Sequence, residues 1–246
     1  MLQYLRSVVF IAQMYVAMPL FGIAFAPWAL FSRRGAYAEC KSYSRYVFWT
    51  ARWMVGMRCE VRGDVPDDEV LIAAKHQSFL DIMMIFTALP AGKFIMKKEI
   101  LWMPVIGIYA RGLGCIPVDR GKRGKAIAKM IEDVEAGRIE AGQLIIYSQG
   151  TRVAPGAKLP YKVGTGVLYD QLGQPCVPVA TNVGVLWPKH GLLRKPGTAV
   201  VEFLPAIAPG LSRDAFMSEL EETVESRSDA LMAEAGFEGM VDERQS

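Results

Sequence analysis

The chain opens with a long apolar stretch and then changes to shorter apolar runs separated by polar segments. Between Arg6 and Arg33 lie 26 residues without a charged side chain, and about 20 such residues are enough to cross the hydrocarbon core of a bilayer. Pro19 and Gly22 lie near the middle, where proline disfavours a continuous helix. The pattern predicts a membrane anchor, either a straight span or a re-entrant or interfacial helical hairpin. A cleaved signal peptide is the alternative, although its apolar core is shorter.

Residues 37–55 continue this region with an amphipathic pattern, in which six aromatic side chains are interleaved with Lys41, Arg45 and Arg52. Aromatic rings with a polar end favour the headgroup level of a membrane, and basic side chains are attracted to anionic lipid. The pattern indicates an interfacial helix, with a core helix as the alternative. Positive charge after the apolar stretch predicts that the following domain lies on the cytoplasmic face. We expect residues 1–58 to form an N-terminal membrane-anchoring, interfacial helical region.

From residue 59 onward, short apolar runs typical of strands alternate with segments of helical periodicity. The strand-like runs are residues 70–74, 94–96, 115–118, 144–147, 176–180 and 199–204. This alternation predicts an α/β domain over residues 59–246. Apolar residues three and four positions apart predict one helix around residues 127–134 and another over about residues 212–235, with Ser212 as its N-cap.

Composition excludes several classes of protein. Hydrophobic residues make up 52% of the 246 residues, and the mean hydropathy is +0.20, so the chain can form a full core and is not disordered. Four cysteines without C-x-x-C spacing and only two histidines give too few ligands for a structural zinc cluster. A reducing, cytosol-facing environment fits this cysteine usage better than a disulfide scaffold.

Charge is distributed unevenly although the net charge is only +3. Residues 1–58 and 93–129 carry a strong excess of lysine and arginine, whereas residues 212–246 are acidic. Basic blocks of this kind suit anionic lipid headgroups, phosphorylated ligands or an acidic carrier protein. Nucleic acid is not expected as a partner, because no basic recognition helix or stacking aromatics on strands accompany the charge.

The first candidate for chemistry is His76 with Asp81, directly after the apolar run 70–74. Ser78 and Asp81 resemble a capping box, so we expect a helix to begin at Ser78 and His76 to lie in the preceding loop. A histidine there can fold back onto an aspartate in the first turn and act as a base that the carboxylate orients. Backbone N–H groups at this helix start can stabilise an oxyanion. The alternative is a packed loop histidine beside an aspartate that only caps the helix.

Three further segments follow in a fixed order, namely residues 114–120, 149–152 and 177–180. With the His76–Asp81 block, they resemble the glycerolipid acyltransferase family, specifically the 1-acyl-glycerol-3-phosphate acyltransferases, over about residues 59–205. No nucleophile elbow, phosphate-binding loop or dinucleotide fingerprint points to another class. The resemblance implies a mixed α/β sheet flanked by helices. It also implies transfer of a fatty acyl group from a thioester to the sn-2 hydroxyl of lysophosphatidic acid, which yields phosphatidic acid in phospholipid biosynthesis.

The resemblance also implies roles for individual residues. His76 removes the proton of the acceptor hydroxyl and Asp81 orients the imidazole. Residues implied to bind the acceptor are Arg120, Gln149, Gly150, Thr151 and Arg152. Val177 and Pro178 are implied to lie beside the acyl channel. Arg120 has an alternative as a surface arginine after a strand, and Val177 with Pro178 equally fits a buried strand.

The segment around residues 149–152 departs from the family's usual F-P-E-G-T-R, because this chain reads Tyr147-Ser148-Gln149-Gly150-Thr151-Arg152. Gln149 keeps hydrogen-bonding capacity but has no negative charge. This change leaves the acceptor open between lysophosphatidic acid and another lyso-lipid, such as a lyso-ornithine lipid. It also supports a rival reading, in which the chain is a non-catalytic lipid-binding membrane protein.

The acyl donor is expected to be a thioester of coenzyme A or of acyl carrier protein, and no metal or bound cofactor is needed. A thioesterase is a further rival, which would release fatty acid without an acceptor. Cys115 lies between apolar residues in an expected strand, so we interpret it as structural rather than nucleophilic. His190 has no recognisable partner in the sequence and is left unassigned.

Overall fold

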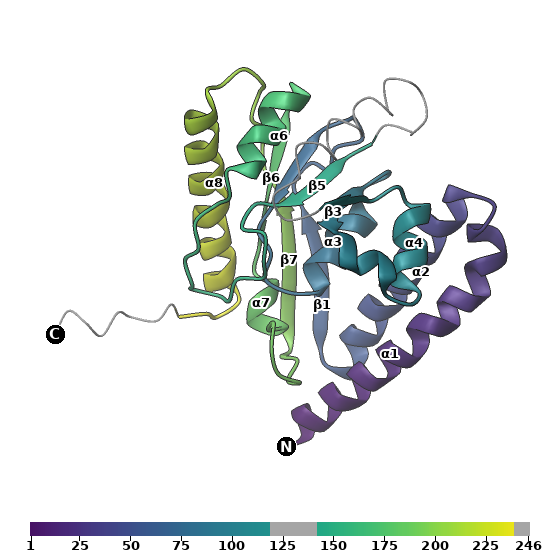
Figure 1. Cartoon of the computed structure of the whole chain (residues 1–246). Helices are drawn as coiled ribbons and strands as arrows, with labels where there is room; N and C mark the ends of the chain where they lie inside the picture. The colour runs from purple at the N-terminus through teal and green to yellow at the C-terminus, as the bar shows by residue number, and fades with distance from the viewer. Residues whose placement is uncertain (119–141, 239–246) are drawn as a thin grey trace.

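The computed structural model describes residues 1–118 and 142–238. In chain order the described elements are α1 (Leu2–Ala29), α2 (Arg33–Met54), β1 (Met57–Arg62), β2 (Leu71–Ala74), α3 (Leu80–Ala88), β3 (Lys93–Lys97), the 3-10 helix η1 (Lys98–Trp102), α4 (Ile106–Gly112), β4 (Ile116–Val118), β5 (Leu144–Tyr147), α6 (Gly164–Leu172), β6 (Cys176–Thr181), α7 (Val183–Leu186), β7 (Gly197–Phe203) and α8 (Arg213–Glu234). Figure 1 shows their arrangement around one twisted sheet.

Within the described residues the sheet has seven strands in the order β1-β7-β6-β2-β5-β3-β4. All neighbours run parallel except β6 and β7, which are antiparallel. Strand β2 lies at the centre and is buried along its whole length. The expected α/β fold with a mixed sheet flanked by helices is therefore confirmed.

The two faces of the sheet bury different sets of side chains. Along β2, Leu71 and Ala73 pack in one hydrophobic cluster with α6 and α8, whereas Ile72 and Ala74 pack in the other with α1, α2, α3 and α4. Figure 1 shows these two helical layers on opposite sides of the sheet. Because side chains alternate along a strand, the residues that follow Ala74 are also directed in turn to the two layers.

The six expected strands correspond to β2 through β7, with end points that differ by one or two residues. Strand β1 was not expected, and it crosses the boundary between residues 58 and 59. Helix α8 agrees with the expected C-terminal helix, and the Ser212 hydroxyl accepts a hydrogen bond from the Ala215 amide, as an N-cap does. The helix expected at residues 127–134 lies outside the described residues.

Helix α1 runs unbroken through Pro19, so of the two alternatives for the apolar stretch the hairpin within residues 7–32 does not occur. The hairpin is instead formed by α1 and α2, which pack side by side (Figure 1). Packing along α2 compensates the backbone hydrogen bond that a proline cannot donate. Among the described helices, α1 is the one that is long and apolar enough to cross a membrane, judged by length and composition. It suggests membrane association.

One face of α1 belongs to the domain core. Phe10 and Met14 are buried, and the Phe10 ring packs edge-on against Trp187 with 5.5 Å between ring centroids. The Ser7 hydroxyl accepts a hydrogen bond of 2.9 Å from the Arg194 amide. The other face exposes apolar side chains, which include Leu5, Val9, Val16, Leu20 and Ile23.

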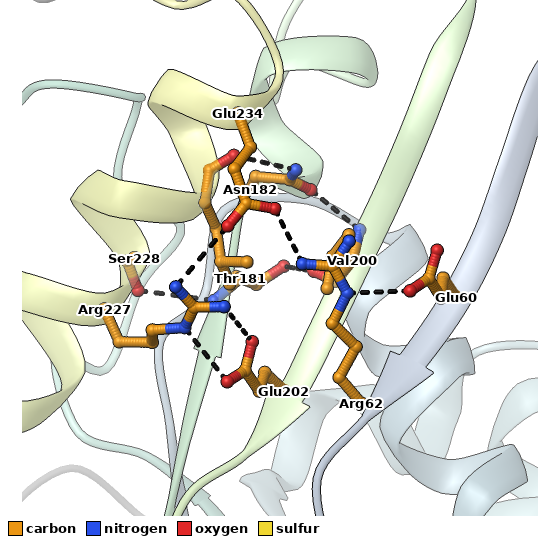
Figure 2. A network of polar contacts seen from close by, with 10 residues as sticks. Glu60, Arg62, Thr181, Asn182, Val200, Glu202, Arg227, Ser228 and Glu234 are labelled. Atoms are coloured by element: carbon orange, nitrogen blue, oxygen red, sulfur yellow. Dashed lines mark hydrogen bonds and ion pairs between the residues drawn. The ribbon is translucent and has the colours of Figure 1, made fainter.

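Helix α8 is fixed to the sheet by a polar network (Figure 2). Arg227 forms two hydrogen bonds of 2.9 and 2.7 Å with Glu202 of β7, and Arg62 of β1 pairs with Glu234 at 2.7 Å. The buried Asn182 amide donates to the Leu231 carbonyl at 3.0 Å. Exposed ion pairs each contribute only about 0.2–1 kcal/mol, so the buried amide and the apolar face of α8 hold the helix more firmly.

Candidate active site

The structure brings His76 and Asp81 together at the carboxyl end of β2. His76 lies in the loop after the strand, and Asp81 lies in the first turn of α3. The imidazole Nδ1 is 2.8 Å from Asp81 Oδ1. Since a carboxylate only accepts, Nδ1–H donates to Asp81 and leaves Nε2 as the unprotonated nitrogen of the neutral ring. The side chain of His76 is 13% exposed and that of Asp81 is fully buried, so the ring but not the carboxylate is open to solvent.

Backbone amides fix the Asp81 carboxylate. Its Oδ2 accepts hydrogen bonds of 2.8 Å from the Gln77 amide and 2.6 Å from the Ser78 amide. The helix begins at Leu80 rather than at the expected Ser78, because the residues before Leu80 curve around the carboxylate. Both amides are therefore occupied, and the expectation that N–H groups directly after His76 stabilise an oxyanion is not met by Gln77 or Ser78.

The imidazole is the end of a stack of aromatic rings that the sequence did not reveal. The Tyr147 ring lies against His76 with 3.9 Å between centroids and 19° between planes. Phe94, Phe86 and Tyr37 continue the stack at successive centroid distances of 6.1, 6.1 and 5.6 Å. These rings come from β5, β3, α3 and α2, so packing across four elements restricts how the imidazole can tilt.

Tyr147 also changes the surroundings of the catalytic pair. Burial, together with the adjacent Asp81 carboxylate, raises the pKa of the Tyr147 phenol well above its usual value. The phenol is therefore uncharged at neutral pH and contributes no competing anion beside Asp81. Its ring supplies an apolar wall along one face of His76.

The segment with residues 149–152 lies beside the His76 loop. The Val153 amide donates a hydrogen bond of 2.8 Å to the His76 carbonyl, and the Gly150 amide donates one of 2.8 Å to the Tyr147 carbonyl. Gly150 has a φ of +68°, a conformation that glycine adopts at little cost. Thr151 is exposed and Arg152 is half-buried. The structure thus brings His76, Asp81 and residues 150–152 together at the carboxyl ends of the central strands β2 and β5.

The side chain of Gln149 points into the protein, away from the exposed Thr151. Its side chain is buried, and the Nε2 group donates a hydrogen bond of 3.0 Å to the Leu159 carbonyl. Its Oε1 atom has no hydrogen-bond partner within residues 1–118 and 142–238. A glutamate here would place a carboxylate against a carbonyl oxygen without a donor. Gln149 therefore holds the loop through its amide group, and its expected contact with the acceptor stays a prediction.

We predict that Gln149→Glu destabilises the protein by about 1–3 kcal/mol, the cost of an unsatisfied buried polar group. A buried carboxyl without donors has a raised pKa, so the loss grows as the pH rises through the carboxyl range. Thermal unfolding measured at several pH values tests this prediction. The matched control is Gln171→Glu, which makes the same change at an exposed position of α6. A more stable Gln149→Glu protein would contradict the assigned role.

The remaining expected residues lie in two places. Val177 and Pro178 belong to β6, where they pair with Ile72 and Ala73 of β2, and Val177 packs in the same hydrophobic cluster as α3. This position fits a buried strand next to the His76 loop, and the acyl channel stays a prediction. Arg120 lies outside the described residues.

On the opposite face of the sheet, a buried ion pair supports the same loops. Lys75 is 2% exposed, and its ammonium group pairs with Glu225 of α8. The Tyr161 hydroxyl donates a hydrogen bond of 3.0 Å to the other oxygen of that carboxylate. Glu225 thereby connects the residue before His76 to the chain that leaves residues 149–152. Sequence reasoning missed this connection.

Comparison with known proteins identifies the family. The sequence model of the acyltransferase family matches residues 57–182, about half of the chain. The chain belongs to the acyltransferase family. A 1-acyl-sn-glycerol-3-phosphate acyltransferase from Pseudomonas aeruginosa is 28% identical over 79% of this chain and 76% of its own. The alpha form from Mus musculus is 29% identical over 74% of this chain and 66% of its own, slightly less than two thirds.

The fold of the acyltransferase agrees with a solved structure. The crystal structure of the 1-acyl-sn-glycerophosphate acyltransferase PlsC from Thermotoga maritima matches with a TM-score of 0.77, at 21% identity over 94% of this chain and 97% of its own. The family match contains His76, Asp81 and residues 149–152, whereas α1, α2 and α8 lie outside it.

Two further reactive side chains, Cys115 and His190, are not assigned to the acyl-transfer reaction. Cys115 is buried, and this burial raises the pKa of its thiol to about 11, so a thiolate nucleophile is not available at neutral pH. This agrees with its interpretation as structural. His190 is exposed and stays unassigned. Among the described residues, no three histidine, cysteine, aspartate or glutamate side chains gather as a metal site would require.

Proposed function

We propose that this acyltransferase transfers a fatty acyl group from an acyl thioester to the sn-2 hydroxyl of lysophosphatidic acid, which forms phosphatidic acid in phospholipid biosynthesis. The observation that carries the proposal is the oriented His76–Asp81 pair, whose loop is hydrogen-bonded to Val153, the residue directly after the Gly-Thr-Arg segment at residues 150–152. The relatives named 1-acyl-sn-glycerol-3-phosphate acyltransferases support the substrate.

The proposed reaction has two proton transfers, both through His76. His76 Nε2 accepts the proton of the acceptor hydroxyl while its oxygen attacks the thioester carbonyl carbon. Asp81 stabilises the imidazolium that forms. When the tetrahedral intermediate collapses, the carbon–sulfur bond breaks and the imidazolium returns the proton to the departing sulfur. Because a thiol has a pKa of about 8.5, the thiolate leaves readily, and neither a covalent enzyme intermediate nor a bound cofactor or metal is required.

Positive side chains beside this pair suit a phosphate group. Arg152 forms no ion pair with any carboxylate in the described parts of the chain, and its carbonyl accepts a hydrogen bond of 3.2 Å from Lys189 Nζ. The stem of Lys162 lies against Gly150, where a Cβ atom would come within 2.9 Å of it. A planar guanidinium can bind two phosphate oxygens at once. We assign the acceptor phosphate to Arg152, with Gly150 and Thr151 beside it.

We predict that Arg152→Gln raises the KM for lysophosphatidic acid about tenfold to hundredfold, because a hydrogen bond to a charged group contributes about 1.5–3 kcal/mol. The kcat at saturation falls much less, because the catalytic pair is unchanged. Initial rates at varied acceptor concentration measure both constants. Lys158→Gln is the matched control, since it removes one exposed charge from the same loop. An unchanged KM in Arg152→Gln would remove Arg152 from the acceptor site.

The exposed apolar face of α1 supports attachment to the membrane. One face of α1 packs in the domain core, with Phe10 and Met14 buried, while Leu20 and Ile23 on the other face are 61% and 71% exposed. A helix held along the domain in this way favours a position in the plane of the interface over a separate span. We place the domain on the cytoplasmic face of the membrane, where coenzyme A or acyl carrier protein thioesters are available.

A substrate panel tests the proposed reaction. Purified protein in phospholipid vesicles is given acyl-coenzyme A or acyl carrier protein thioester together with lysophosphatidic acid, a lyso-ornithine lipid or no acceptor. Phosphatidic acid as the main product supports the proposal. Preferential acylation of the lyso-ornithine lipid would correct the acceptor, and the absence of turnover with every acceptor would favour a non-catalytic lipid-binding protein.

A further inference from the structure

A continuous band of aromatic rings crosses the seam between α1 and α2. Successive ring centroids lie between 5.4 and 6.5 Å apart. The rings in order are Trp28, Phe25 and Phe21 of α1, followed by Tyr46, Trp49 and Trp53 of α2. Trp49 and Trp53 are each 61% exposed. Tryptophan and tyrosine rings at a protein surface favour the headgroup level of a bilayer, so this band indicates where the interface meets the hairpin.

A pocket of about 440 Å³ lies at the α2 end of this band, between α2 and the edge strand β1. It is lined by Phe48, Trp49, Arg52, Arg58, Cys59 and Glu60. The two arginines come from different elements, since Arg52 lies on α2 and Arg58 on β1. Both are exposed, so the pocket opens at the surface.

The pocket lining carries a net positive charge, because it contains two arginines and one glutamate. Within the described chain, neither Arg52 nor Arg58 forms an ion pair. The pocket's own carboxylate does not neutralise them, because Glu60 already accepts a hydrogen bond of 2.7 Å from Arg62 Nε. Two free guanidinium groups at one opening bind the oxygens of a phosphate group. Helix α2 and strand β1 thus provide positive charge next to an aromatic surface.

We propose that this pocket binds the phosphate headgroup of an anionic phospholipid of the bilayer, and so fixes the enzyme to the membrane apart from its active site. A lipid is favoured over free phosphate because Trp49 of the aromatic band lines the same pocket as the two arginines. The headgroup phosphate enters between Arg52 and Arg58 while the acyl chains stay in the bilayer along the exposed aromatic rings. The proposal does not depend on the catalysed reaction.

Vesicle binding tests the pocket. The full-length protein is sedimented with phosphatidylcholine vesicles that contain or lack phosphatidylglycerol, and we expect about tenfold tighter binding to the anionic vesicles, because both guanidinium groups hold one headgroup phosphate together. Arg52→Gln and Arg58→Gln each remove most of that gain, and the double variant loses no more than either alone. The matched control is Arg45→Gln, an exposed arginine on α2 outside the pocket, which keeps most of the gain.

Several results would overturn the proposal. Equal losses in all three single variants, or additive losses in the double variant, would assign the gain to diffuse attraction by surface charge. Release of the wild-type protein by inorganic phosphate at constant ionic strength would assign the pocket to free phosphate. Absence of any preference for anionic vesicles would leave the pocket without its ligand. Circular dichroism melting curves that match the wild type show that the variants are folded.

Discussion

The His76→Ala variant is expected to lose acyl transfer by about 10³-fold in kcat, within the 10²–10⁴-fold range of general-base catalysis. The structure supports this because His76 Nε2 is the free nitrogen of a ring whose Nδ1 donates to Asp81 at 2.8 Å. Without the imidazole, the site lacks the nitrogen that accepts the proton of the acceptor hydroxyl. Release of the thiol from the acyl thioester, followed spectrophotometrically with saturating acceptor, measures the loss.

Cys115→Ala is the matched control for this prediction, because it shortens another buried and potentially reactive side chain without touching the imidazole. Its rate per folded molecule is expected to equal that of the wild type. If His76→Ala kept the wild-type rate, or if Cys115→Ala lost it, the assignment of His76 as the base would be wrong. Melting curves separate loss of folding from loss of chemistry.

The Asp81→Asn variant is expected to lower kcat by about 10²–10³-fold, again within the range for acid–base catalysis. The Gln77 and Ser78 amides both point to Oδ2, so the single amide oxygen of asparagine is required there. The NH₂ group then faces His76 Nδ1 and donates to it. This reversal moves the ring proton to Nε2, so the nitrogen that faces the acceptor can no longer serve as the base.

The KM values and the melting temperature separate the effect of this reversed tautomer from a general loss of structure. Asp81→Asn should keep the KM for both substrates and a melting temperature close to that of the wild type, because the backbone hydrogen bonds to the side-chain oxygen persist. Ser78→Ala serves as the control, since its hydroxyl only accepts a bond of 3.3 Å from the Leu80 amide. If Asp81→Asn were as active as the wild type, Asp81 would be a structural cap alone.

Much of the central sheet could be predicted because its strands are apolar runs between turn residues. Strand β1 was missed because Arg58, Glu60 and Arg62 alternate with its apolar residues, a pattern typical of an edge strand rather than of a buried one. The contact of His76 with Asp81 was predictable because a five-residue separation across a loop and a helix start is local. The sequence left open whether the apolar stretch bends at Pro19, and the structure shows one continuous helix α1 that packs against α2 and the core.

The contacts that hold the His76 loop in place could not be predicted, because they join residues that lie far apart in the sequence. The ring stack from Tyr37 to His76 combines residues of α2, α3, β3 and β5, and no sequence spacing relates them. The pairing of Lys75 with Glu225 joins residues 150 positions apart. Gln149 shows the same limit. The sequence pointed to Gln149 only as part of the acceptor site and did not reveal the hydrogen bond from its amide group to the Leu159 carbonyl.

The most direct test of the central claim is to measure thiol release and phosphatidic acid in one sample of the wild-type enzyme. The protein is supplied with an acyl thioester labelled in its acyl chain, with and without lysophosphatidic acid. We predict equal molar amounts of thiol and labelled phosphatidic acid, with no thiol released when the acceptor is omitted. Thiol and free fatty acid formed without acceptor would contradict the account, because the base would then be activating water instead of a lipid hydroxyl.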